Sequence, residues 1–365
     1  MKKVLGFLKS EIVLVISFVL AAVSCFIVTP DKGYIEYIDF KTLALLFCLM
    51  AVTSGLGSMG VFRVLAEKMM KRVRSFSLLS LLLCLLCFFS SMLITNDVAL
   101  ITFVPFTLII LNMINKKDKA IILVTLETVA ANLGSMATPI GNPQNLYLFS
   151  KYEMSMGDFF SAILPFATLS LVLVVIFSLF TGKEKIEINT EKTDFSFDTK
   201  IIVYAVLFVL SLLSVFRAVD YRILLVVSLA AIVIFDRKVL KNIDYSLLLT
   251  FVFLFVFIGN LGRITVISEF LRNTVSGREI MTGIISSQVF SNVPAAILLS
   301  NFTDNVKELL VGVNLGGLGT LIASMASLIS FKLVQKEKIN TGKYILVFSL
   351  VNIAFLGANL LLVLI

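Results

Sequence analysis

The chain has 365 residues, of which 59% are hydrophobic and only 15% are charged, and its formal net charge is +8. Soluble domains carry about 25% charged residues, so this composition excludes an ordinary soluble protein and predicts a protein that lies in a bilayer. The chain has no histidine, and its four cysteines lie in apolar runs. We therefore expect no metal site, no cofactor and no enzymatic activity.

Apolar runs long enough to cross about 30 Å of hydrocarbon predict nine membrane crossings. The crossings cover 11–28, 41–62, 119–154, 159–180, 200–217, 222–236, 245–266, 306–332 and 343–365. No small-residue cleavage site follows the first run before Pro30, so we interpret that run as a retained span rather than a signal peptide. The crossings at 119–154 and 306–332 each contain an interruption.

Two further apolar segments, 77–112 and 279–302, have a polar turn at their centre. The first contains SSMLITNDVA from Ser90, and the second contains SSQVFSNVPA from Ser286. Backbone leaves helical geometry at membrane depth only where protein or a watery cavity covers it. Each segment therefore predicts a re-entrant helical hairpin, and the pair indicates an internal duplication.

The interrupted crossings are duplicated as well. ANLGSMATPIGNPQN from Ala131 and VNLGGLGTLIASMAS from Val313 align on Asn-Leu-Gly, a Thr and an Ile, and Ile38-Asp39 matches Ile243-Asp244. We predict an all-α polytopic membrane protein with two inverted repeats, each holding one hairpin and one broken transmembrane helix. The first repeat covers 1–180 and the second covers 218–365. A cytoplasmic linker and a linker transmembrane helix at 181–217 join the two repeats and invert the second.

The distribution of positive charge supports this topology. With a cytoplasmic N-terminus, the inner connections hold 22 of the 31 lysines and arginines, as the positive-inside rule requires. The basic run at 63–74 lies between a span and a hairpin, so we interpret it as an anchor facing anionic lipid and expect no nucleic-acid partner. The localisation predicted is the plasma or bacterial inner membrane.

Polar residues at the hairpin turns and helix breaks form the candidate substrate site. Helix N-termini attract anions, and side-chain amides and hydroxyls supply both donors and oxygen ligands. Prolines break the first crossing by removing backbone donors, and glycines break the second because they tolerate irregular backbone. The residues that we expect at the substrate are Thr95, Asn96, Thr138, Gly141, Asn142, Ser291, Asn292 and Thr320.

Asp97 and Glu127 are acidic residues within predicted membrane segments, where a carboxylate is costly and usually functional. Asp97 fits sodium binding, proton transfer or repulsion of anions. Glu127 either faces the same cavity or forms a hydrogen bond with Thr125, Thr128 or a turn serine. The residues that we assign to ion coupling are Asp97, Glu127, Asn132, Asn145, Asn314 and Gly316. No lysine or arginine falls at mid-membrane, so helix ends and co-bound cations would have to hold an anionic substrate.

Across its whole length, the order of these motifs resembles the ion transporter superfamily. This group includes divalent-anion/sodium symporters, citrate permeases, arsenite efflux permeases and some sodium/proton antiporters. TPIGNPQN at 138–145 carries the most specific resemblance. The resemblance implies that Asn96 and Asn292 contact the substrate, that nearby oxygens form sodium sites at the hairpin turns, and that a transport domain moves like an elevator. It also implies a homodimer.

The hairpin turns differ from the Ser-Asn-Thr of the dicarboxylate branch, because they read Thr-Asn-Asp and Ser-Asn-Val, and Asn96-Asp97 is similar to the Asn-Asp of arsenite permeases. We expect secondary active transport of a small anionic solute, a carboxylate or an inorganic oxyanion, coupled to Na⁺ or H⁺ by alternating access. The alternatives are arsenite efflux and sodium/proton exchange, with Asp97 as the titrating group. A channel fits inverted repeats with broken helices less well.

Overall fold

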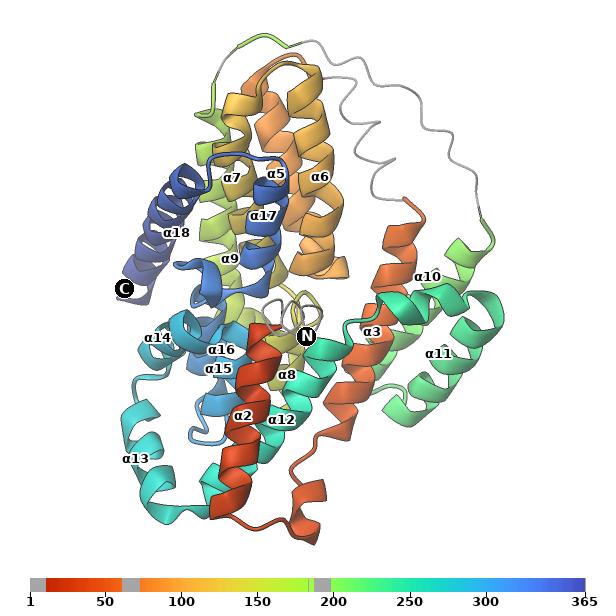
Figure 1. Cartoon of the computed structure of the whole chain (residues 1–365), viewed down its shortest axis with the longest axis vertical. Helices are drawn as coiled ribbons and strands as arrows, with labels where there is room; N and C mark the ends of the chain where they lie inside the picture. The colour runs from red at the N-terminus through yellow and green to blue at the C-terminus, as the bar shows by residue number, and fades with distance from the viewer. Residues whose placement is uncertain (1–10, 61–72, 183, 187–197, 365) are drawn as a thin grey trace, which may run out of the picture.

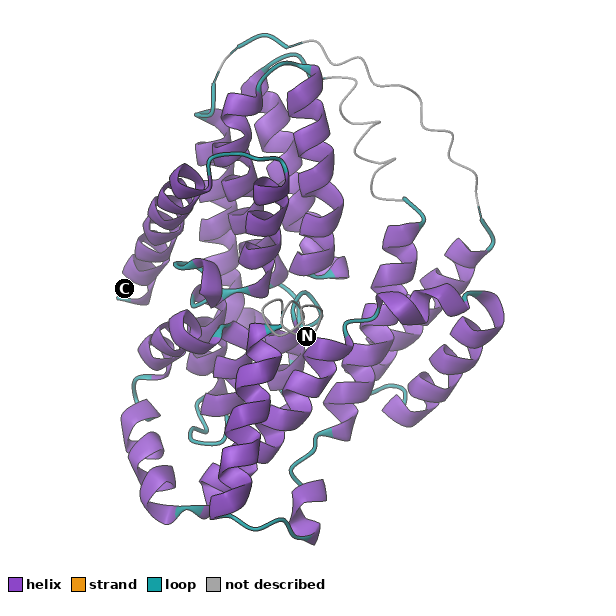
Figure 2. Ribbon diagram, viewed as in Figure 1, coloured by secondary structure: helices purple, strands orange, loops and turns teal. Residues whose placement is uncertain are grey.

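The computed structural model describes residues 11–60, 73–182, 184–186 and 198–364, and within these ranges the chain is helical, with one isolated bridge between Ser75 and Lys185 and no strand. The predicted all-α fold is confirmed (Figure 2). The first ten residues and most of the basic run at 63–74 lie outside the described residues. The interpretation of the basic run as a lipid anchor therefore stays a prediction.

The first half of the chain contains both predicted discontinuities. Its helices are α2 (Ile12–Ile27), η1 (Lys32–Ile35), α3 (Phe40–Ser58), α5 (Phe76–Ile94), α6 (Asn96–Met113), η2 (Lys117–Lys119), α7 (Ala120–Ser135), α8 (Pro143–Lys151) and α9 (Met156–Leu179). The predicted hairpin is the pair α5–α6, which breaks at Thr95. The predicted broken helix is the pair α7–α8.

The second half contains the same series. Its helices are α10 (Lys200–Val215), α11 (Tyr221–Phe235), η3 (Arg237–Asn242), α12 (Tyr245–Arg263), α13 (Thr265–Val275), α14 (Glu279–Phe290), α15 (Asn292–Leu299), α16 (Val306–Leu315), η4 (Leu321–Ala323), α17 (Met325–Lys336) and α18 (Thr341–Val363). The pair α14–α15 is the second hairpin, and α16 and α17 are the arms of the second broken helix. The short helix α13 was not predicted.

Within the described ranges, six helical segments are long and apolar enough to cross a membrane. They are 32–58, 76–94, 96–113, 156–179, 245–263 and 341–363, and three shorter apolar helices cover 13–27, 200–215 and 221–235. The helices α9 and α18 leave many large apolar side chains exposed, as lipid-facing helices do. Both arms of the first hairpin are among the six. They are therefore longer than a re-entrant hairpin needs, whereas α14 and α15 have only 12 and 8 residues.

The two hairpins approach the middle of the molecule from opposite ends. In Figure 1, α5, α6 and α7 occupy the upper part, whereas α14, α15 and α16 occupy the lower part. The broken helices also run in opposite directions, because α7 is above α8 whereas α16 is below α17. An inverted repeat predicts this arrangement. Its symmetry operation and the predicted domain boundaries stay predictions.

The helices α3 and α12 begin in the same way in both halves. Asp39 and Asp244 are their N-cap residues, with φ/ψ of −79°/84° and −78°/84°, and each carboxylate accepts the backbone N–H three residues later, at 2.9 Å. Such a cap satisfies one of the donors that a helix start leaves free. In Figure 1 the two helices run in opposite directions.

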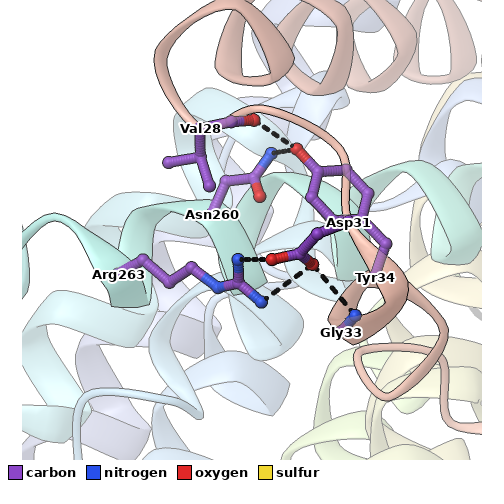
Figure 3. Close-up of polar contacts among 6 residues, drawn as sticks. All are labelled: Val28, Asp31, Gly33, Tyr34, Asn260 and Arg263. Atoms are coloured by element: carbon purple, nitrogen blue, oxygen red, sulfur yellow. Dashed lines mark hydrogen bonds and ion pairs between the residues drawn. The ribbon is translucent and has the colours of Figure 1, made fainter.

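A polar clasp fixes the connection between α2 and α3 against the end of α12 (Figure 3). Arg263 donates to both carboxylate oxygens of Asp31, at 2.6 and 3.2 Å, and this interaction lowers the pKa of Asp31. Asn260 donates to the hydroxyl of Tyr34 at 2.8 Å, and that hydroxyl donates to the carbonyl of Val28 at 2.5 Å. The clasp therefore joins the end of α2 to the second half of the chain.

Close packing of α5 against α7 depends on Gly134. A Cβ atom at this position would overlap the backbone carbonyl of Phe88, so only glycine lets the two helices approach as they do. Small residues serve this purpose between membrane helices.

Gly134→Ala should therefore lower the melting temperature, because overpacking typically costs about 1–3 kcal/mol and here the neighbour is backbone. Gly357→Ala is the matched control, since Gly357 lies within α18 and a Cβ there meets nothing within 4 Å. Scanning fluorimetry of the purified proteins compares the two. Equal melting temperatures for Gly134→Ala and the parent protein would contradict the close approach.

Candidate functional site

Both hairpin turns have the same unusual backbone geometry. Thr95 has φ/ψ of 71°/155° and Ser291 has 74°/155°, a region that glycine occupies almost exclusively. A non-glycine residue pays about 1–3 kcal/mol to remain there, and such residues cluster at binding sites. The turns directly precede Asn96 and Asn292, which begin the returning helices α6 and α15. Both asparagines are buried.

Asn132 of α7 reaches across the molecule to the start of α17. Its side-chain oxygen accepts the hydroxyl of Ser324 at 3.0 Å, and its amide nitrogen is 3.4 Å from the hydroxyl oxygen of Ser327. Ser324 is the N-cap residue of α17. A residue of the first broken helix thus contacts the break in the second one.

Asn314 of α16 makes the reciprocal contact. Its side-chain oxygen accepts from the amide of Asn142 at 3.0 Å, and its own amide donates to Asn145 at 2.7 Å. Asn142 is the N-cap residue of α8 and also accepts the backbone N–H of Asn145. Because Asn132 and Asn314 are equivalent in the repeat, the two contacts are the same interaction made twice with the halves exchanged. We call these residues the asparagine network: Asn132, Asn142, Asn145, Asn314, Ser324 and Ser327.

The first hairpin turn joins the asparagine network directly. The Asn96 amide donates to the side-chain oxygen of Asn132 at 3.0 Å, and its backbone N–H donates to the carbonyl of Gly141 at 3.3 Å. The second turn lies beside the second break, because a Cβ on Gly317 would be 3.0 Å from the amide nitrogen of Asn292. Two hairpin turns and two helix breaks therefore meet in one buried polar region.

The remaining predicted substrate residues have different surroundings. Thr138 donates to the carbonyl of Met92 at 2.6 Å, and a Cβ on Gly141 would overlap the backbone of Ser135. Thr320 is exposed, and its backbone N–H donates to the Gln288 side chain at 2.9 Å. The structure thus groups Thr138 and Gly141 with the asparagine network and leaves Thr320 at its edge.

A cavity of about 700 Å³ lies between α3 and the first hairpin turn. Its wall includes Thr95, Asp97 and Asn142, together with Asp244 at the start of α12 and Met325 of α17. Residues of the second hairpin do not contribute to its described wall. Within the described chain, both charged residues that line it are aspartates, so its field favours cations.

Asp97 and Glu127 occupy different environments. Asp97 lines the cavity, and its oxygen Oδ1 is buried without a hydrogen-bond partner in the described structure. Glu127 has no exposed surface, does not line the cavity, and accepts a hydrogen bond from Thr107 of α6. Neither alternative predicted for Glu127 describes its surroundings, since it does not line the described cavity and its partner is Thr107 rather than Thr125, Thr128 or a turn serine. Thr125 and Thr128 donate to carbonyls one turn earlier in α7.

Gly316, which is among the residues assigned to ion coupling, packs closely against the second hairpin. A Cβ there would lie 2.5 Å from the hydroxyl oxygen of Ser287 in α14. Gln288, on the same helix, donates to the carbonyls of Gly316 and Leu318 at 2.9 Å each. The second break is therefore held against the second hairpin.

Sequence reasoning missed four residues that belong to the site. Ser324 and Ser327 stand at the same repeat positions as Asn142 and Asn145, so aligning the repeats through the second break would have found them. Gln288 lies inside the duplicated motif, but no signal marked its role. Asp244 was read as a loop charge, although the duplicated Ile-Asp motif contains it.

Paired hairpins and broken helices that meet in a buried polar region are typical of multi-pass membrane transporters. The chain belongs to the citrate transporter family, since the family described as "Citrate transporter" matches residues 5–329. An uncharacterized transporter of Methanocaldococcus jannaschii is 34% identical over 331 residues, which is 90% of each chain. The inner membrane protein YbiR of Escherichia coli is 29% identical over 321 residues, 87% of this chain and 86% of its own. A silicon efflux transporter of Oryza sativa is 32% identical over 139 residues, 38% of this chain and 28% of its own.

Thr95→Gly and Ser291→Gly should each raise the melting temperature, because glycine adopts φ near 70° without the strain that threonine and serine carry. Ser155→Gly is the control, since Ser155 is also an N-cap but has an ordinary φ of −75°. This control should leave the melting temperature unchanged or lower it slightly. Lower melting temperatures for both turn variants would show that the turns are unstrained.

Proposed function

We propose that this protein is a secondary active carrier that moves a small anionic solute, a carboxylate or an inorganic oxyanion, together with Na⁺ or H⁺ by alternating access. The observation that carries the proposal is the asparagine network, in which the two broken helices hold each other beside the first hairpin turn. Inverted-repeat carriers place their substrate and ions at such meeting points.

Asn96 and Asn292 are the proposed substrate contacts, with Thr95, Thr138, Gly141, Asn142, Ser291 and Thr320 around them. Side-chain amides donate to carboxylates and oxyanions, and the starts of α6 and α15 add favourable helix dipoles. Asn96 and Asn292 are buried, and both stand at the first position of a helix. An anion held there would lie at the positive ends of both helices.

Asp97 is the proposed coupling residue. It follows Asn96 directly, lines the cavity, and has a buried carboxylate oxygen without a partner in the described structure. A buried carboxylate is stable only when it binds a cation or a proton. Because Asp97 and Asp244 are the charged residues in the described wall, an anion would enter this cavity with a cation, and this requirement produces coupling. Glu127, Asn132, Asn145, Asn314 and Gly316 complete the proposed ion-coupling set.

A second candidate function is sodium/proton exchange or efflux of arsenite. The acidic wall of the cavity, without lysine or arginine among its described residues, favours this candidate. In an exchanger, Asp97 would bind the two cations alternately and no anion would be needed. An arsenite carrier would bind an uncharged hydroxylated solute, which requires hydrogen-bonding groups rather than a basic residue.

The proposal also includes a cytoplasmic N-terminus, a plasma or inner membrane location and a homodimer. The excess of lysine and arginine in the predicted inner connections supports the orientation. The proposal includes no nucleic-acid partner.

Asp97→Asn should reduce ion-driven transport at least about tenfold, because the amide neither carries a proton nor neutralises a cation. Uptake of citrate, phosphate and arsenite into proteoliposomes is measured under an imposed Na⁺ or H⁺ gradient, with cation exchange followed in parallel. Glu279→Gln is the matched control. Its carboxylate is also buried, but it accepts from Thr303 at 2.7 Å and does not line the cavity.

Undiminished sodium- and proton-driven transport in Asp97→Asn would contradict the assignment of Asp97. Driven cation exchange without movement of any anion would favour the second candidate function instead.

A further inference from the structure

A second cavity of about 510 Å³ lies away from the asparagine network. It is bounded by the segment before α3, by the end of α8, by α12 and by the end of the second hairpin. The residues that line these walls include Lys41, Tyr147, Lys151, Phe255 and Asn301. Sequence analysis assigned no role to any of these residues.

This cavity is the counterpart of the first one in the internal repeat. Asp244, Ile101 and Ile329 line the first cavity, and their repeat equivalents Asp39, Ile297 and Tyr147 line the second. The first cavity lies at the end of α3 and the beginning of α12, whereas the second lies at the beginning of α3 and along the later part of α12. The two cavities therefore lie at opposite ends of the same two helices.

Their charges differ, because two lysines line the second cavity together with three carboxylates, whereas the charged residues in the described wall of the first cavity are both aspartates. The Lys151 ammonium donates to the hydroxyls of Tyr147 and Ser300, at 3.1 and 2.9 Å, and to the side-chain oxygen of Asn301. It also lies 5.5 Å from the centre of the Tyr147 ring. All these partners are neutral, and no carboxylate of the described chain forms an ion pair with Lys151. No ion pair with a described carboxylate therefore compensates its positive charge.

The acidic residues of this cavity offset that charge only in part. Asp39 keeps its negative charge, but its carboxylate caps α3, where both oxygens accept hydrogen bonds from Thr42, at 2.9 and 2.5 Å, and the positive end of the helix dipole partly balances the charge. Glu36 and Glu153 are exposed, so water screens their charges. Lys151 and Lys41 are only partly exposed, which makes their fields stronger inside the cavity.

Two hydroxyl groups in the wall have no partner. Ser150 is 7% exposed, and its oxygen Oγ makes no hydrogen bond in the described structure. The hydroxyl of Tyr37 is buried and unpartnered in the same way. Both residues line the cavity. Unsatisfied polar groups in the wall of a cavity that also holds an ammonium indicate a site that a polar ligand completes.

We infer that the second cavity is a binding site for an anionic group, a carboxylate or an oxyanion, with Lys151 as its recognising residue. It would receive the solute on the face opposite to the first cavity. The inference rests on the proposed function only for the identity of that solute. Lys151 thereby supplies the positive charge that the first cavity lacks.

The charge preference of this cavity can be measured without knowing the transported solute. The four native cysteines are replaced by alanine, and Asn301→Cys places one thiol at an exposed position beside Lys151. The purified protein is treated with an anionic reagent, sulfonatoethyl methanethiosulfonate, and with a cationic one, trimethylammonioethyl methanethiosulfonate. Each rate is divided by the rate of the same reagent with 2-mercaptoethanol.

The normalised ratio of anionic to cationic rates should exceed one. Lys151→Gln should lower the ratio about tenfold. Removing the positive charge raises the electrostatic energy of the anionic reagent in the cavity and lowers that of the cationic reagent. Lys151→Arg should preserve it. Lys241→Gln is the control, because Lys241 is exposed in η3, near the first cavity.

A normalised ratio below one in the Asn301→Cys protein would overturn the inference and indicate a cation site. This outcome is measured on the Asn301→Cys protein alone, so it does not depend on whether the Lys151 variants fold. A ratio that Lys151→Gln leaves unchanged would also overturn it. Because no transport is measured, failure here leaves the proposed function standing. If the parent protein shows no ion-driven transport in proteoliposomes, the proposed function is refuted. The ratio of the two reagent rates is a separate measurement and is not affected by that result.

Discussion

The structure depends on satisfying the backbone groups that its broken helices release. In a membrane no water is available to bind these groups, so side chains must do so. The Asn145 amide donates to the carbonyls of Met136 and Thr138, both at 3.0 Å, and Thr138 in turn donates to Met92 in the first hairpin. Gln288 performs the same task for two carbonyls of the second break. These side chains therefore stabilise both breaks.

The same amides connect the two halves, so stability and function share one set of residues. Asn132 and Asn314 each accept one hydrogen bond through the side-chain oxygen and donate one through the side-chain nitrogen, and both partners belong to the opposite broken helix. A change in the position of one broken helix must therefore be matched by the other. This coupling suits a carrier in which the hairpins and the broken helices of both halves move as one unit while the site remains assembled. Strained backbone at Thr95 and Ser291 adds energy that a bound ligand is able to offset.

Much of the fold was predictable because its signals are local. The apolar run at 200–217 became α10, Lys200–Val215, and both hairpins break at the predicted turns. Contacts that depend on tertiary register were not predictable. Thr107 became the partner of Glu127 only because the packing of α6 on α7 brings them together. Lys151 lies at a helix end, where its sequence position resembles that of any loop lysine.

The central claim is that one site, built by both halves, binds an anion and a cation together. The most direct measurement is the melting temperature of the purified protein with citrate, sulfate, phosphate and arsenite, each with and without Na⁺ at two pH values. A ligand that binds the folded protein must stabilise it by mass action. We predict that one anion raises the melting temperature only in the presence of Na⁺ or at the lower pH, and that Asn96→Ala and Asn292→Ala each abolish this increase. Stabilisation by the anion that is independent of cation and pH and survives both substitutions would contradict the account.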